Sequence, residues 1–326
     1  MMTKNDFEKK QCIYIFTVEG ERVSFRNDNI LVMNGEGVVV HQSSCYRIFA
    51  IFIIGHTTIT TGIIQKSQKF GFPIYIMSPS FRTIDAIGHS VEGNCRLRQL
   101  QYAYHELELA KHIVANKIRN QRAILELQRT NDWKLRECAL NLSELEDSVS
   151  DYKGDFRGLM GIEGTASRMY FKRNFDNVDW NGRKPRIKCD MVNSTLDIGY
   201  TLLFNFVDAL LGLYGFDTYL GIYHREFYLR KSLVCDMVEP FRPLIDWQIR
   251  KSINLGQIKE AHFNVVDGRW LLDIRNNKDY LKFLIKPLME NKVTMFLYFQ
   301  SYYRAFMRSY EAERFPVFEI GGSKRF

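Results

Sequence analysis

Two short segments of the chain carry acidic side chains in settings that suit chemistry. In the first, residues 161–171, Glu163 lies between two glycines, just ahead of a helix that we predict to start near Thr165. Glycine lets the backbone approach a ligand closely, and a helix N-terminus favours a nearby carboxylate. The alternative is an ordinary helix cap with a solvated glutamate, and this segment on its own leaves both open.

The second segment, residues 221–243, contains one histidine and two carboxylates. Asp236 and Glu239 are three residues apart, so on a helix they would share one face. Pro240 disfavours helical geometry at the preceding residue, which predicts a kink at Glu239. Both acids follow His224 closely enough in the chain for all three side chains to reach one site.

The neighbours of these two carboxylates are apolar, and a bare charge beside a core is costly unless it is paired or bound to a metal. Two carboxylates and one histidine form a hard, oxygen-dominated ligand set that suits Mg²⁺ or Mn²⁺. The alternative is an acidic pair bridged to Arg242 or Arg225, and the residues alone do not decide between the two.

Basic residues recur beside both acidic segments. A solvated face is the ordinary explanation for any single basic cluster. Their repetition beside each acidic motif predicts a metal site set in a phosphate-binding surface. The candidate nucleic-acid-binding residues are Arg168, Lys172, Arg183, Lys184, Arg186, Arg225, Arg230, Lys231 and Arg242.

The elements that must position these residues differ between the two parts of the chain. Up to about residue 90, short runs rich in valine, isoleucine and aromatic residues alternate with turn signals, which predicts β-strands. After Gly93 the apolar residues follow helical spacing, and the main break lies at 181–188. The predicted fold is α+β, with a small β-rich domain at 1–92 and a large all-α catalytic domain at 93–326. We expect strands near 12–17, 22–25, 30–33, 37–41, 46–55 and 73–77, and helices over 57–70 and 96–129.

Composition narrows the class of protein. The formal charge of +8 and a sequence pI near 9.1 fit a polyanionic partner, nucleic acid before membrane. The six cysteines include no CxxC pair, which suits neither a zinc ribbon nor a disulfide framework. The first ten residues lack an apolar signal-peptide core, and the apolar runs at 46–54 and 201–216 are too short to span a bilayer. We therefore expect a cytoplasmic protein that does not enter the membrane.

Several motifs occur in an order and spacing that resembles the Cas-one integrases of CRISPR systems. Residues 117–121 on the first long helix and the strand pattern that ends at 72–77 also look like family segments, so the resemblance covers nearly the whole chain. Many relatives carry two glutamates before the phenylalanine where this chain has Glu239 and Pro240, a form similar to that of type II and type V systems. The motifs are Gly161-Ile-Glu-Gly164 with Tyr170-Phe171, Asn193 with Gly199-Tyr200, Tyr219-Leu-Gly-Ile-Tyr-His224, and Ser232-Leu-Val-Cys-Asp-Met-Val-Glu-Pro-Phe-Arg-Pro243.

The resemblance implies a β-rich N-terminal domain that helps to form a homodimer and a helical catalytic domain. It implies that Glu163, His224 and Glu239 bind a divalent metal ion, Mg²⁺ or Mn²⁺, and that Asp236 is a neighbouring acidic residue of the catalytic set. The implied reaction is transesterification, in which the 3′-hydroxyl of a short DNA fragment attacks a phosphodiester at the border of a CRISPR repeat. No covalent protein intermediate is needed.

The partners that the resemblance implies are DNA and the small Cas-two protein, which in the family bridges two Cas-one dimers. The family implies a prokaryotic cytoplasm as the location. Two other functions stay open at this point. One is a structure-directed, metal-dependent endonuclease that acts on branched DNA through the same residues. The other is a DNA-binding scaffold without catalytic activity, against which the intact set of Glu163, His224 and Glu239 argues.

Overall fold

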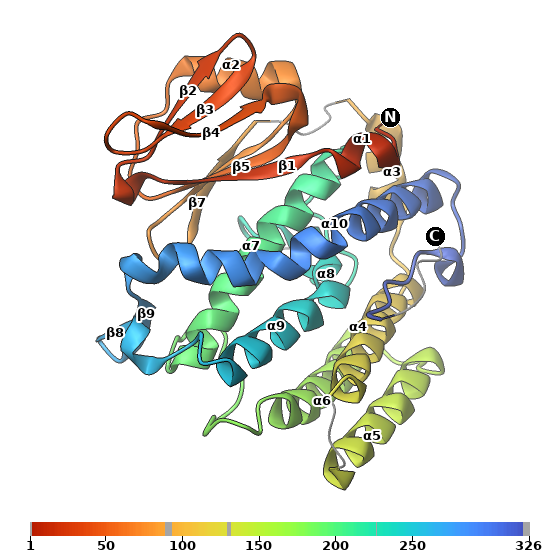
Figure 1. Cartoon of the computed structure of the whole chain (residues 1–326). Helices are drawn as coiled ribbons and strands as arrows, with labels where there is room; N and C mark the ends of the chain where they lie inside the picture. Colours follow the sequence, from red (N-terminus) through yellow and green to blue (C-terminus); the bar gives the residue numbers. More distant parts are fainter. Residues whose placement is uncertain (1, 89–92, 129–131, 226, 322–326) are drawn as a thin grey trace.

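The structure is a computed structural model that describes residues 2–88, 93–128, 132–225 and 227–321. Strands occupy the first part of the chain and helices the rest (Figure 1), so the predicted α+β class is confirmed. One antiparallel hairpin, β8 (Phe263–Val266) with β9 (Arg269–Leu272), lies within the helical part, which is therefore not purely α-helical. None of the described helices is long and apolar enough to cross a membrane.

The N-terminal region contains two small sheets. In the mixed sheet the strand order is β1-β5-β6-β7, with β1 and β6 parallel to β5 and with β7 antiparallel to β6. All seven residues of β5 are buried, as expected for a parallel strand that is covered on both faces. The other sheet is antiparallel, in the order β2-β3-β4. The bounds are β1 (Gln11–Phe16), β2 (Arg22–Arg26), β3 (Asn29–Met33), β4 (Val39–Ser44), β5 (Ile48–Ile54), β6 (Ile74–Met77) and β7 (Thr83–Ile87).

The helices of the chain are of very different lengths. Two of them, α1 and α2, belong to the N-terminal region, and the others form the helical part (Figure 1). A short 3₁₀ turn, η3 (Glu239–Phe241), connects α8 to α9. The bounds are α1 (Lys4–Glu8), α2 (Thr61–Phe70), α3 (Cys95–Ala103), α4 (Glu108–Glu126), α5 (Trp133–Ser150), α6 (Phe156–Asn174), α7 (Met191–Gly212), α8 (Ser232–Met237), α9 (Arg242–Asn254) and α10 (Asn277–Met307).

Three details of the predicted elements are wrong. The helix expected over 57–70 begins only at Thr61, because Thr60 still has extended backbone. The helix expected over 96–129 is two helices, since Tyr104 is extended and its hydroxyl accepts a hydrogen bond from the Leu109 N–H at the start of α4. The short helix α1 and the strand β7 were not predicted. Strand β7 has only a weakly apolar sequence and is defined by its pairing with β6.

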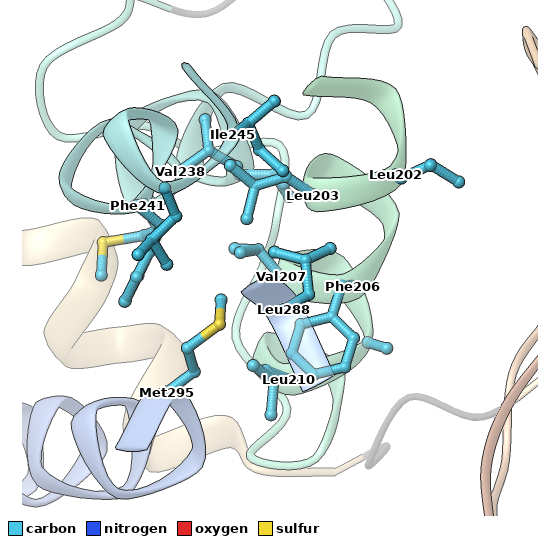
Figure 2. Packing of buried hydrophobic residues seen from close by; sticks show 14 of the residues in the cluster. Leu202, Leu203, Phe206, Val207, Leu210, Val238, Phe241, Ile245, Leu288 and Met295 are labelled. Carbon is cyan, nitrogen blue, oxygen red and sulfur yellow. The ribbon is translucent and has the colours of Figure 1, made fainter. Parts of the chain in front are cut away.

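Helix α7 is the centre of the helical part, because it is buried on nearly every side. Its apolar side chains meet those of α8, η3, α9 and α10 (Figure 2). The same core continues into the N-terminal region, where the ring of Phe49 on β5 lies 5.3 Å from that of Phe206 on α7. The segment that carries Asp236 and Glu239 is thus fixed against the central core. The residues labelled in Figure 2 are Leu202, Leu203, Phe206, Val207, Leu210, Val238, Phe241, Ile245, Leu288 and Met295.

Gly199 lets α7 approach α9 and α10 closely. A Cβ atom at this position would lie 2.5 Å from Cγ2 of Ile245 and 3.2 Å from Cδ2 of Leu284. We predict that Gly199→Ala lowers the free energy of unfolding by about 1–3 kcal/mol, because the core is overpacked. Gly161→Ala is the matched control. Nothing lies within 4 Å of a Cβ there, so it should stabilise the helix by about 0.5–1 kcal/mol. Urea unfolding of both variants measures the difference, and equal effects would contradict the close packing.

Candidate active site

Glu163 lies in the interior of α6 and not at a helix N-terminus. The helix begins at Phe156, where the Asp155 side chain caps it by accepting a hydrogen bond from the Gly158 N–H at 2.8 Å. The predicted helix start near Thr165 is therefore wrong. Glycine disfavours a helix by only about 1 kcal/mol, and packing of the buried apolar face of α6 against α4 and α5 offsets this.

Asp236 holds the loop that carries His224. Its fully buried carboxylate accepts hydrogen bonds from the backbone N–H groups of Ile222 at 2.6 Å, Tyr223 at 3.0 Å and His224 at 2.8 Å. The Nδ1 atom of His224 lies 2.6 Å from the same carboxylate. An ionised carboxylate can only accept, so Nδ1 donates to it and Nε2 is the ring nitrogen left free to bind another partner.

Gly221 is required for this loop to fold around the carboxylate. A Cβ atom on Gly221 would lie 2.2 Å from the carbonyl oxygen of His224 and 3.0 Å from Oδ2 of Asp236. Real Cβ contacts do not reach such distances, and one of the partners is backbone that cannot move aside. The loop thus presents the His224 ring in one orientation, and Asp236 fixes that orientation.

Lys117, on α4, joins the two glutamates of the site. Its ammonium group forms ion pairs with Glu163 on α6 and, at 2.6 Å, with Oε2 of Glu239 on η3. The Lys117 side chain is only 6% exposed and that of Glu239 only 4%, so these two charges are largely removed from water, whereas Glu163 is 22% exposed. Burial opposes the charged ammonium, but the two carboxylates outweigh it and raise the pKa of Lys117.

Glu239 also contacts a second cation. Arg242, one turn further along the chain, lies 3.1 Å from Oε1 of Glu239. Burial favours the protonated acid, but Arg242 and Lys117 outweigh it and lower the pKa of Glu239. The alternative in which an arginine bridges an acidic residue is therefore observed for Glu239. Asp236 does not share this arginine in the described structure, since it serves the His224 loop.

Behind Arg242 lies the half-buried aromatic ring of Tyr200. The guanidinium groups of Arg242 and Arg183 lie 5.0 Å and 5.3 Å from the ring centre of Tyr200. The Tyr200 hydroxyl donates to Asp246, whose pKa burial raises to about 7. This network fixes Arg242, and so supports the side chain of Glu239 from behind.

The structure brings three of the four predicted catalytic residues into one neighbourhood and gives the fourth a supporting place. Glu163 and Glu239 meet at Lys117, and the hydroxyl of Tyr223, the residue before His224, lies 3.5 Å from Glu163. Lys117 was noted in the sequence only as part of a family segment. In the sequence, Lys117 is a lysine on a helix that has an apolar face. This pattern does not show whether the ammonium group is buried or on the surface.

A divalent cation fits the chemistry of this donor set. Within the described ranges, no three His, Cys, Asp or Glu side chains are grouped closely enough to hold a metal ion as they stand. Glu163 and Glu239 nevertheless converge on one cation, and Oε2 of Glu239 is buried without a hydrogen bond of good geometry. The residues that could hold a metal ion are Glu163, Glu239 and Nε2 of His224, with Lys117 displaced.

The predicted nucleic-acid-binding residues divide into three groups. Three have carboxylate partners: Arg183 with Asp197, Lys231 with Asp208 and Arg242 with Glu239. These three side chains hold the protein together as described. Arg230 is half-buried and bonds to the loop backbone, with its guanidinium donating to the Arg225 carbonyl. The remaining candidates are exposed: Arg168, Lys172, Lys184, Arg186 and Arg225.

Sequence comparisons relate the chain to known proteins. The family model described as CRISPR associated protein Cas1 matches residues 13–286. A CRISPR-associated endonuclease Cas1 from Rhodospirillum rubrum is 26% identical over 275 residues, which cover 78% of this chain and 79% of that protein. Another from Thermus thermophilus is 29% identical, covering 71% and 70%. A Cas4 exonuclease/Cas1 endonuclease fusion from Rhodospirillum rubrum is 27% identical over 76% of this chain, which spans 46% of that fusion.

Solved structures share the fold. A Cas1 protein from Thermotoga maritima has a TM-score of 0.77 at 17% identity, covering 91% of this chain and 97% of that one. A casposase bound to an integration product has a TM-score of 0.77 at 19% identity, covering 96% of both. A complex described as Cas6-RT-Cas1 with Cas2 gives a TM-score of 0.79 at 24% identity, covering 95% of this chain and 36% of that one.

Lys117 neutralises the carboxylates of Glu163 and Glu239, so its removal should destabilise the folded protein. We predict that Lys117→Met lowers the free energy of unfolding by about 3 kcal/mol, the lower end of the range for removing one partner of a buried ion pair, because Arg242 still faces Glu239. The matched control is Lys111→Met on the same helix, whose partner Glu108 is half exposed. That change should lower the free energy of unfolding by only about 0–1 kcal/mol. Chemical unfolding without divalent metal measures both, and equal costs would contradict the role of Lys117.

Proposed function

This chain belongs to the Cas1 family, and from that premise we propose that it is a divalent-metal-dependent DNA integrase of CRISPR spacer acquisition. Its substrates would be a short DNA fragment with a free 3′-hydroxyl and the border of a CRISPR repeat. The observation that carries the proposal is the convergence of Glu163 and Glu239, from different helical elements, on one buried cation beside an oriented histidine.

The proposed reaction exchanges one phosphodiester bond for another. The 3′-oxygen of the fragment bonds to the repeat phosphorus, and the bond from phosphorus to the 3′-oxygen of the repeat strand breaks. A bound metal ion would polarise the scissile phosphate and stabilise the leaving oxygen. Glu163, Glu239 and Nε2 of His224 would hold that ion. Asp236 would act as a positioning residue, since it fixes the ring of His224 and the backbone before it.

The surface beside His224 suits a DNA end. Phe227 and Tyr228 follow His224 closely in the chain and are 70% and 85% exposed, an unusual exposure for aromatic rings. The side chain of Arg225 is exposed next to them. Exposed rings with a flanking cation can stack on unpaired bases while the cation contacts phosphate. We propose that this loop holds the single-stranded end of the fragment, together with the exposed residues Arg168, Lys172, Lys184 and Arg186.

A structure-directed endonuclease is the second candidate, because curated relatives bear the name endonuclease. One assay separates the two activities. The protein is given Mn²⁺, a repeat-containing supercoiled plasmid and a labelled short duplex with free 3′-hydroxyls. An integrase joins the label covalently to the plasmid, and a duplex with 3′-deoxy ends is not joined. Plasmid nicking with no joined label would favour the endonuclease.

The same assay tests the residues of the site. We predict that Glu163→Ala, His224→Ala and Glu239→Ala each abolish strand transfer while DNA binding is largely retained. Asp236→Ala should reduce transfer by roughly 10–100-fold, as expected for a residue that orients a metal ligand. Near-ultraviolet circular dichroism verifies the fold of each variant. If Asp236→Ala were inactive and Glu239→Ala close to wild type, the assignment of the ligand would be reversed.

We propose further that the protein is a homodimer through its N-terminal region and that a Cas2 protein bridges two such dimers. Two observations support this. The relative of known structure with Cas2 shares the fold, and β4 leaves one edge of its sheet open beside exposed Val38, Val39 and Val40. An open strand edge with exposed apolar side chains favours pairing with another chain. Light scattering tests the dimer, and a single monomeric mass at micromolar concentration would contradict it.

A further inference from the structure

Helix α4 presents a stripe of three polar side chains at four-residue spacing, namely His112, Asn116 and Asn120. The segment 316–320 lies along this stripe, and its alternate residues contact the stripe through backbone groups. Four helical residues rise by about 6 Å and two extended residues advance by about 6.6 Å. The spacing of the three side chains along the helix therefore matches that of alternate residues in an extended segment. The side chains bond to the backbone of the segment much as a neighbouring strand would.

The side-chain amides of Asn116 and Asn120 each donate to and accept from the backbone of the segment. Asn116 donates to the Phe318 carbonyl at 2.7 Å and accepts from the Phe318 N–H at 2.9 Å. Asn120 donates to the same carbonyl at 2.8 Å and accepts from the Ile320 N–H at 3.0 Å. Both asparagines are buried, with 2% and 0% exposure. Buried amides with satisfied hydrogen bonds define one geometry, because any shift would leave a polar group unpaired.

Asn120 has one more partner, and it belongs to the site. Its side-chain amide also donates to the carbonyl oxygen of Pro240 at 3.0 Å. Pro240 directly follows Glu239 in the 3₁₀ turn η3. The segment contacts the same turn through Phe318, whose ring centre lies 4.6 Å from that of Phe241. Two contacts thus hold η3, the turn that carries Glu239. Asn120 bonds to the backbone of the turn at Pro240, and Phe318 packs against Phe241, the last residue of the turn.

The neighbouring face of α4 holds the site itself. Lys117, next in the chain to Asn116, forms the ion pairs with Glu163 and Glu239. One helix therefore sets both the backbone of η3, through Asn120, and the carboxylate of Glu239, through Lys117. A cation that displaces Lys117 would remove the second of these restraints. The Asn120 restraint does not depend on the cation and would remain.

We propose that the segment 316–320, docked on His112, Asn116 and Asn120, is a clamp that keeps Glu239 in position for metal binding, and that Asn120 is the positioning residue that connects the clamp to the site. This inference rests on the proposed function, since it assigns Glu239 to the metal. The clamp restrains Glu239 from a part of the chain that supplies no metal ligand. Loosening the clamp should weaken metal binding without removing any ligand.

The test is titration with Mn²⁺, followed by the electron paramagnetic resonance signal of the free ion. Asn120→Ala should weaken Mn²⁺ binding by roughly 10–100-fold, the effect expected when the support of a ligand is lost. Strand transfer at limiting Mn²⁺ should fall through kcat with KM for DNA unchanged, and excess Mn²⁺ should restore it. Amide exchange over residues 238–242 should become faster, because Pro240 and its neighbours lose their anchor.

Asn116→Ala is the matched control. It removes two hydrogen bonds to Phe318 on the same stripe but keeps the bond from Asn120 to Pro240. Because the segment stays docked on Asn120 and the bond to Pro240 remains, its Mn²⁺ affinity should fall by much less than that of Asn120→Ala. A folded Asn120→Ala protein with wild-type Mn²⁺ affinity would overturn the proposal, and so would equal weakening in both variants, since either result denies the bond to Pro240 a special role.

A second variant decides the question if Asn120→Ala does not fold. Compared with Ile320→Val, which keeps the N–H and allows for the lost packing of the side chain against the core, Ile320→Pro removes the N–H that donates to Asn120, at the periphery of the clamp. Weaker Mn²⁺ binding by this variant supports the clamp, and unchanged binding overturns it. Failure of the proposed function is recognised separately. It would show as a wild-type protein that neither binds Mn²⁺ nor transfers strands, whereas failure of the clamp leaves wild-type activity intact.

Discussion

The structure depends on two carboxylates, one buried and one half-buried, that meet at one buried cation. Glu163 and Glu239 come from different elements, and each would be costly away from water without a positive partner. Lys117 supplies that partner from a third element. Three parts of the helical region are therefore tied at one point, and the arrangement is chemically able to exchange an ammonium group for a divalent ion. If the proposed site binds metal, stability without metal and affinity for metal would be linked in the same side chains.

The remaining elements restrict where these charges can be. The central helix α7 and its apolar neighbours fix the segment of α8, η3 and α9, so that Glu239 is attached to a rigid core (Figure 2). Asp236 uses its carboxylate on backbone N–H groups and on one nitrogen of His224, which leaves the other nitrogen available. Tyr200, between two guanidinium groups, holds Arg242 against Glu239. These groups near the site each have a supported orientation, which is the preorganisation that the proposed strand transfer would require.

Much of the fold followed from local pattern. Alternating apolar runs separated by turn residues predicted most strands, and the hairpin at Asn27 and Asp28 has the positive φ values that its residue types favour. The predicted helix start near Thr165 is wrong because glycines next to Glu163 are typical of a helix end, whereas tertiary packing carries α6 through them. The roles of Lys117 and Asn120 could not be predicted, since both depend on partners far away in the sequence. Periodicity shows which face of a helix is buried, but not which distant carboxylate or carbonyl a polar residue on that face will meet.

We propose that Glu163, Glu239 and His224 form a cation site that Lys117 occupies when no metal is bound. The most direct test is anomalous X-ray diffraction from crystals of the protein with Mn²⁺. We expect one manganese peak in contact with both carboxylates and with Nε2 of His224, and an ammonium group of Lys117 that has moved away from between the glutamates. Manganese bound elsewhere, with Lys117 still pairing Glu163 and Glu239, would contradict this proposal.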